Sequence, residues 1–187
     1  MFPFRLTREL SLELLDVRHA EELFHLTDAN REHLRAWLPW VDQARSTDDT
    51  LAFIRLTRKR LADDNGFQTV IREQDALVGV IGHVAVSWAD RSTSLGYWLS
   101  KDAQGRGIMT EACRAFISHA FTTMALNRVE IRCATENRRS RAIPERLRFT
   151  PEGTVRQAEW LYDHFVDLVV YGMLASEWTP SRTDGTP

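Results

Sequence analysis

The spacing of apolar residues predicts a strand followed by helices in the first third of the chain. Leu10, Leu12 and Leu14 alternate with polar residues, which is typical of a half-buried strand. Apolar residues then recur at helical spacing in three segments: residues 17–29, 30–38 and 50–62. Polar residues that can cap a helix precede the last two of these segments: Asn30 and Ser46.

The middle of the chain carries three strand-like runs, residues 67–71, 76–88 and 93–99. Short polar connections separate these runs and favour antiparallel hairpins. Gly79 and Gly82 interrupt the second run. They predict a bulge or the close approach of another backbone.

A helix lies between the third of these runs and the next strand. Apolar residues from Met109 to Met124 fall on one helical face, and residues 129–133 then alternate as a strand. Strands joined by a helical crossover lie parallel, so we expect 93–99 and 129–133 to form a parallel pair. Ligands in such units bind at the carboxyl ends of the strands.

The last part of the chain predicts a helix and a hairpin. The helix covers residues 137–148, a turn follows at 149–153, and the hairpin strands are 153–161 and 164–174. Residues 176–187 are rich in Ser, Thr, Pro and Gly. We therefore expect one domain over residues 1–175 and a flexible tail over 176–187.

Composition narrows the class of protein. With 187 residues, 43% of them hydrophobic, the chain suits one globular domain. Its 24 basic and 26 acidic residues give a net charge of −2, so nucleic acid is not an expected partner. There is no apolar run of about 18 residues, and Cys113 and Cys133 lack metal-ligand spacing. We expect a cytoplasmic protein with reduced cysteines and no membrane partner.

Candidate chemistry lies in the turn before the fourth helix, where Gly105 and Gly107 stand one residue apart. Such glycines allow a tight turn, and the helix start adds unpaired N–H donors and a partial positive charge. Together they form a site suited to phosphate. A P-loop is excluded because Ile108 and Met109 follow the last glycine, and Thr110 stands where a dinucleotide fingerprint needs a small residue.

The remaining pattern, Gln104-Gly105-Arg106-Gly107, resembles the pyrophosphate-binding signature of the GNAT superfamily of acyl-CoA N-acyltransferases. The predicted order of elements resembles the GNAT fold over roughly residues 7–175. The similarity is greater to the bacterial group that acetylates ribosomal proteins at N-terminal serine or alanine. It rests on five blocks: residues 30–40, 97–99, 104–112, 137–140 and 152–161.

This resemblance implies an α/β (α+β) fold with a mixed, mostly antiparallel sheet of about seven strands and helices on both faces. Its central parallel pair would splay around acetyl-CoA, the cosubstrate, and no metal would be needed. The resemblance assigns cofactor-binding positions as follows: Leu99, Gln104, Gly105, Arg106, Gly107, Ile108, Met109, Thr110, Asn137 and Ser140.

The resemblance also implies catalytic roles. Ser140 matches a residue that protonates the departing thiolate, and Glu159 matches the carboxylate proposed as general base. Trp37 and Trp40 are expected to wall the acceptor pocket. The structural alternatives are a helix cap for Ser140, a solvated strand residue for Glu159 and core packing for the tryptophans.

The chemistry favours an N-terminal α-amine as acceptor. An amine with a pKa near 7.7–8.0 needs roughly 1 kcal/mol to be neutral at pH 7, whereas lysine needs about 4 to 5 kcal/mol. A small-molecule amine, such as an antibiotic or polyamine, is the nearest alternative. A homodimer is compatible with the resemblance, because related enzymes often pair.

Two residues depart from the family pattern near the thiol end of the expected site. Pro144 has no N–H to donate to the carbonyl of residue 140, which predicts a kinked or shifted helix. Arg148 stands where the family usually has glycine, so a left-handed turn there would cost about 1 kcal/mol. These departures keep open a further alternative, a CoA-binding sensor without catalysis.

Overall fold

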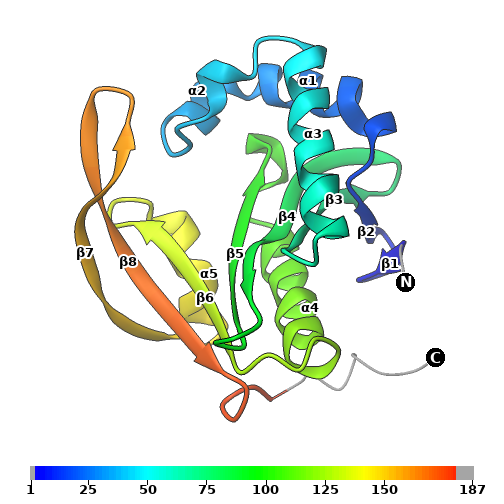
Figure 1. Cartoon of the computed structure of the whole chain (residues 1–187). Helices are drawn as coiled ribbons and strands as arrows, with labels where there is room; N and C mark the ends of the chain where they lie inside the picture. Colours follow the sequence, from blue (N-terminus) through cyan, green and yellow to red (C-terminus); the bar gives the residue numbers. More distant parts are fainter. Residues whose placement is uncertain (1–2, 180–187) are drawn as a thin grey trace.

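The computed structural model describes residues 3–179, which form one mixed sheet of eight strands flanked by helices (Figure 1). The strand order is β1-β2-β3-β4-β5-β6-β8-β7. The strands are β1 (Phe4–Arg5), β2 (Leu10–Leu14), β3 (Phe67–Glu73), β4 (Ala76–Ser87), β5 (Ser92–Leu99), β6 (Arg128–Ala134), β7 (Thr150–Leu161) and β8 (His164–Leu174). The α-helices are α1 (Ala20–Ala29), α2 (Arg31–Arg35), α3 (Thr47–Ala62), α4 (Ile108–Thr122) and α5 (Arg138–Arg146).

The predicted parallel pair is confirmed, and it is short. β5 and β6 pair from Ser92↔Arg128 to Leu95↔Ile131, whereas every other pairing in the sheet is antiparallel. Beyond Leu95, β5 stays paired with β4 alone, and β6 follows β8. The sheet therefore opens between its two central strands, as the splayed pair predicts.

Helices cover both faces of the sheet, as expected (Figure 1). On one face the apolar side of α4 is buried, including Cys113, Phe116 and Ile117. On the other face Leu23 of α1 and Ile54 of α3 pack against strand residues. In α1, α3 and α4 the buried residues share one side of the helix, so burial of that side against the sheet fixes the position of each.

Two glycines of β4 allow close contact with the neighbouring strands. A Cβ on Gly79 would lie 2.3 Å from the carbonyl oxygen of Trp98, and one on Gly82 would lie 2.5 Å from that of Phe67. Both distances are too short for a side chain. The predicted close approach of another backbone is therefore confirmed.

Several local predictions were wrong. The short strand β1 was not predicted; with it the mixed sheet has eight strands, where about seven were expected. β7 begins at Thr150, so the expected turn at 149–153 is mostly strand. Asn30 makes no capping hydrogen bond; its side chain donates to the carbonyl of Leu26 (2.9 Å) and accepts from the N–H of Lys101 (2.8 Å). Ser46 does cap α3, accepting from the N–H of Asp49.

The start of the expected tail is anchored to α4. The Trp178 indole N–H donates to Ser118 Oγ (3.1 Å), and the ring lies near Phe121. Glu177 accepts a hydrogen bond from the N–H of Leu174 (2.9 Å). The rest of that segment, residues 180–187, lies outside the described residues.

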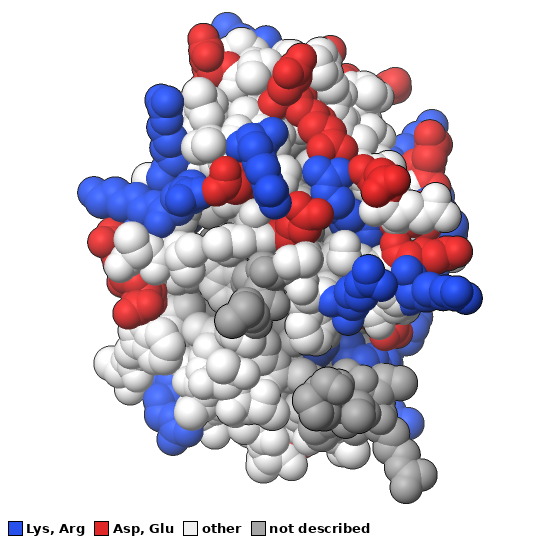
Figure 2. Space-filling model, turned by 90° about the vertical axis from the view of Figure 1, so that its right-hand side faces the viewer, with Lys and Arg blue, Asp and Glu red and all other residues white. Residues whose placement is uncertain are grey.

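Charges of both signs are intermixed on the face shown in Figure 2, without one continuous basic field. Within the described residues, Arg72 illustrates how such charges pair, with Glu13 at 3.1 Å and Glu22 at 2.8 Å. Within residues 3–179 no helix is both long and apolar enough to cross a membrane.

Candidate active site

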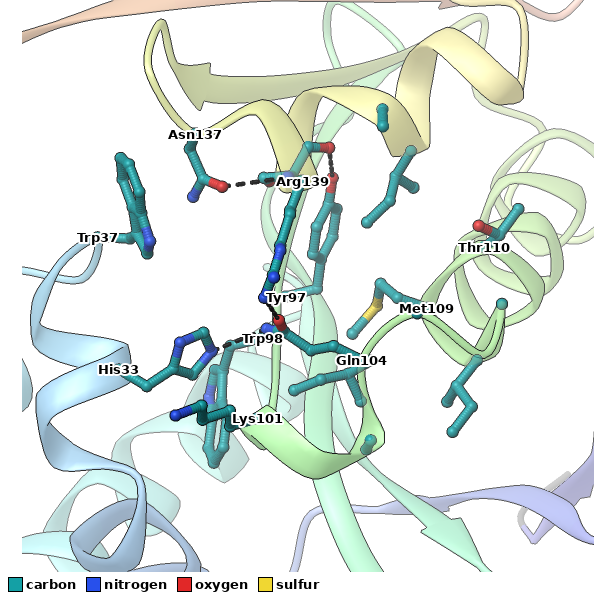
Figure 3. Close-up of a pocket in the computed structure, with 18 of the residues that line it drawn as sticks. His33, Trp37, Tyr97, Trp98, Lys101, Gln104, Met109, Thr110, Asn137 and Arg139 are labelled. Carbon is teal, nitrogen blue, oxygen red and sulfur yellow. Dashed lines mark hydrogen bonds between the residues drawn. The ribbon is translucent and has the colours of Figure 1, made fainter.

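A cleft of about 980 Å³ lies where β5 and β6 separate. Its walls come from α2, the end of β5, the turn before α4 and the first turns of α4 and α5 (Figure 3). Tyr97 and Trp98, which point to opposite faces of β5, both line it. The cleft therefore passes from one face of the sheet to the other through the splay.

The glycine turn forms one end of this cleft. Gly105 and Gly107 have φ values of 77° and 79°, and Gly107 precedes the first residue of α4. No atom lies within 4 Å of a Cβ built on either glycine. The turn before α4 therefore borders open space, and the phosphate site predicted from the sequence would use the N–H groups of this helix start.

The other predicted cofactor residues occupy different positions around the turn. Leu99, Gln104, Ile108, Met109 and Thr110 line the cleft. Arg106 is not among the lining residues; its guanidinium pairs with Glu73 at 2.8 Å. The cofactor contact expected of Arg106 therefore stays a prediction.

Gln104 connects two walls of the cleft. Its side-chain carbonyl accepts a hydrogen bond from Arg139 of α5 (2.8 Å), and its amide nitrogen lies 2.8 Å from His33 Nε2 on α2. Burial, together with the nearby cations Arg139 and Lys101, lowers the pKa of His33. The neutral ring can therefore accept the amide hydrogen of Gln104, and Figure 3 shows this chain of contacts.

His33 and Arg139 were missed by the sequence reasoning. Both lie inside sequence blocks that carry the family resemblance, so these blocks already pointed to them as candidate site residues. Their contacts with Gln104 could not be predicted from the sequence, because the three residues belong to different elements.

Asn137 and Ser140 lie together at the start of α5. Asn137 caps the helix, because its side-chain oxygen accepts a hydrogen bond from the N–H of Ser140 (3.1 Å). The alternative that Ser140 is itself the cap is therefore wrong. Its hydroxyl oxygen lies 3.2 Å from Cys133 Sγ, and both Asn137 and Ser140 line the cleft.

The two departures from the family pattern leave α5 in place. The helix continues through Pro144 to Arg146, and the kink or shift expected at the proline stays a prediction. Arg148 adopts the left-handed conformation, with a φ of 63°, and Phe149 donates to the carbonyl of Pro144 (2.9 Å). The turn after α5 thus keeps the shape that glycine would favour, at the expected conformational cost.

Glu159 lies on β7, next to a register shift between Val155 and Glu159. The side chain is half-buried and is not among the residues that line the cleft. Burial raises the pKa of its carboxyl, and no ion pair of Glu159 is found among residues 3–179. A carboxylate in this condition is a stronger base than an exposed one.

The tryptophan turn lies on the α2 side of the cleft. Trp37 lines the cleft, whereas Trp40 packs against the cleft residue Trp98 with ring centroids 6.2 Å apart. The turn is also fastened to the last hairpin, since the Tyr162 hydroxyl donates to the carbonyl of Leu38 (2.6 Å). Arg35 lies 3.8 Å above the Tyr162 ring. Sequence reasoning missed Tyr162, whose partners are far away along the chain.

Comparisons with known proteins show the family to which this fold belongs. The model of the acetyltransferase (GNAT) domain family matches residues 9–150. The protein YdaF of Bacillus subtilis (strain 168) is 35% identical over 179 residues, which cover 95% of this chain and 98% of YdaF.

Two solved structures with bound ligands are similar to the whole fold. RimL, the ribosomal L7/L12 alpha-N-protein acetyltransferase in complex with coenzyme A, has a TM-score of 0.88 at 26% identity, covering 91% of this chain and 96% of RimL. The microcin C7 self-immunity acetyltransferase MccE, in complex with acetyl-CoA and AMP, has a TM-score of 0.87 at 25% identity, covering 90% and 94%. The chain therefore belongs to the GNAT acetyltransferase family and is an N-acetyltransferase that uses acetyl-CoA.

Proposed function

We propose that this enzyme acetylates the N-terminal α-amine of a protein or peptide, in the manner of the ribosomal-protein acetyltransferases. The observation that carries the proposal is that one cleft continues from the glycine turn of α4 to Trp37 and His33 beside α2. Donor and acceptor can then meet within the sheet from opposite faces. The similarity to RimL supports a protein N-terminus as the acceptor.

The donor side has the groups that a CoA thioester requires. Backbone N–H groups from Gly105 to Thr110 bind the pyrophosphate, because they combine free donors with the positive end of α4. The edge of β5 near Leu99 and the side chain of Asn137 bind the pantetheine arm. Acetyl-CoA supplies an activated acetyl group. The protein therefore has to position the amine, remove a proton from the ammonium group and supply a proton to the departing sulfur.

Glu159 acts as the base and Ser140 as the acid in these two proton transfers. Glu159 takes a proton from the substrate ammonium group, directly or through water, and its raised pKa improves it as a base. The neutral amine forms a bond to the thioester carbon as the carbon–sulfur bond breaks, and the nitrogen then releases its second proton to solvent to give the neutral amide. Ser140 gives its hydroxyl proton to the departing sulfur and regains one from solvent.

The acceptor side is bounded by Trp37, with Trp98 supported from behind by Trp40. Tyr162 holds the tryptophan turn against the last hairpin, which also carries Glu159. An acceptor amine that enters between α2 and this hairpin therefore approaches both the aromatic wall and the proposed base.

The test is acetyl transfer to peptides that begin with serine or alanine, followed as release of free thiol from acetyl-CoA. We expect turnover of free peptides and none of the same peptides with blocked N-termini. Glu159→Gln and Ser140→Ala should lower kcat by at least tenfold, whereas the exposed control Glu21→Gln on α1 should not. Turnover of polyamines or antibiotics, with peptides inert, would establish the small-molecule alternative.

A further inference from the structure

Pro144 leaves a gap in the hydrogen bonding of α5. In an α-helix the carbonyl of residue 140 accepts from the N–H of residue 144. Proline has no N–H, so the carbonyl of Ser140 loses this donor. A buried or half-buried carbonyl without a partner is destabilising, and here it belongs to the proposed proton donor of the reaction.

A residue of β5 fills this gap. The Tyr97 hydroxyl donates to the carbonyl oxygen of Ser140 at 3.3 Å, and Figure 3 shows this bond. Tyr97 lies two residues beyond Leu95, the last residue of β5 that pairs with β6. The bond therefore spans the opening between the central strands and ties α5 to β5.

The Tyr97 hydroxyl is suited to donate this hydrogen bond. Its ring packs against the core cluster on the α4 side of the sheet. Burial raises the pKa of Tyr97 well above its ordinary value, so the hydroxyl stays protonated at neutral pH.

The backbone of Ser140 is thus held through both its N–H and its carbonyl group. Asn137 accepts from its N–H within the same helix, whereas Tyr97 donates to its carbonyl from across the cleft. The contact from Tyr97 is the one that relates Ser140 to β5, along which the pantetheine arm is proposed to bind. Loss of that contact would leave the helix cap intact and would free Ser140 to shift relative to the thioester.

We propose that Tyr97 is a positioning residue for Ser140, and that its hydroxyl replaces the backbone donor that Pro144 removes. The inference rests on the proposed function, in which Ser140 protonates the departing sulfur. It predicts an energetic coupling between Tyr97 and Pro144, although one is on a strand and the other is in a helix.

A double-mutant cycle tests this coupling. Tyr97→Phe should lower kcat about fivefold, the value of one neutral hydrogen bond, with the KM for acetyl-CoA changed less than twofold. Pro144→Ala restores an N–H at position 144 and should leave kcat within twofold of the wild type. In the Pro144→Ala background, Tyr97→Phe should then cost less than twofold. Equal losses in both backgrounds would overturn the proposal.

Tyr171→Phe is the matched control. The Tyr171 hydroxyl also contacts α5, at Arg141 Nε (3.0 Å) and Glu145 Oε1 (2.7 Å), but not at Ser140. This variant reports a general loosening of the helix, and its effect should be the same with proline or alanine at position 144. Coupling of Tyr171 to Pro144 as strong as that of Tyr97 would contradict a specific role for Tyr97.

Hydrogen exchange separates this proposal from the proposed function, because it needs no acceptor. Exchange of the amides of residues 138–143 should be faster in Tyr97→Phe than in wild type, and the added Pro144→Ala change should restore protection. Unchanged exchange would refute the anchoring by Tyr97. If Ser140→Ala keeps full activity, Ser140 has no catalytic role, and the predicted kinetic effect of Tyr97→Phe is refuted as well. The exchange result still decides whether Tyr97 anchors residues 138–143.

Discussion

The stability of this protein should depend on pH through a histidine in the core. His83 is 1% exposed and packs against the rings of Phe67 and Phe116, with centroid separations of 5.2 and 4.9 Å. Thr93 Oγ1 donates to the carbonyl of Ala85 (2.8 Å), so His83 Nδ1, 3.2 Å away, is the donor to Thr93. Nε2 is then the unprotonated ring nitrogen, and its lone pair has no hydrogen-bond partner among the described residues.

The magnitude follows from the cost of charging this ring. Burial, with a smaller effect of His119, lowers the pKa of His83 to about 3 from an unfolded value of 6.5. Neutral His83 therefore makes its full contribution to the free energy of unfolding above pH 6.5. This contribution is lost as the pH falls from 6.5 towards 3, because His83 binds a proton in the unfolded state before it does so in the folded state. Between pH 7.0 and 5.5 the expected loss from His83 is about 1.3 kcal/mol.

The assay is urea unfolding at pH 7.0 and 5.5 for the wild type and for His83→Phe. The variant keeps an aromatic ring and cannot titrate, so its stability should fall by about 1.3 kcal/mol less over this range. His25→Gln, at an exposed histidine of α1, is the control and should keep the wild-type dependence. An identical pH dependence in wild type and His83→Phe would refute the reasoning.

Three further predictions concern single positions. Arg148→Gly should raise the free energy of unfolding by about 1 kcal/mol and Tm by about 2–4 °C in thermal melts, because φ is 63° there; no rise would contradict the strained turn. Gly107→Ala should weaken acetyl-CoA binding at least tenfold by calorimetry, because its Cβ would enter the space before α4 at a φ of 79°; unchanged affinity would remove the glycine turn from the site. Tyr162→Phe should raise the acceptor KM several-fold by releasing Leu38, and leave the KM for acetyl-CoA unchanged; the opposite split would place Tyr162 on the donor side.

The elements that the sequence predicted well are those with strong local patterns. The apolar face of α4, the alternation in β6 and the glycine turn between β5 and α4 each follow from residues close together in the chain. The parallel pair followed from them, because a helical crossover requires it. The short strand β1 carries no such pattern, and it was missed.

The contacts that position the site could not be predicted in the same way. Tyr97 and Ser140 are 43 residues apart, and Gln104 and His33 are 71 apart. Such pairs depend on how β5, α2 and α5 pack, and residue spacing contains no information about that packing. Asn30 shows the same limit, because its side chain binds the N–H of Lys101, 71 residues away, instead of capping α2.

The central claim is that the cleft delivers an N-terminal α-amine, and not a lysine, to acetyl-CoA. The most direct measurement is tandem mass spectrometry of a serine-initiated peptide that also contains one lysine, after incubation with the enzyme and acetyl-CoA. The account predicts acetylation at the α-amine alone, with a large loss in Glu159→Gln. Acetylation confined to the lysine, or an unmodified peptide under conditions where a small amine is turned over, would contradict it.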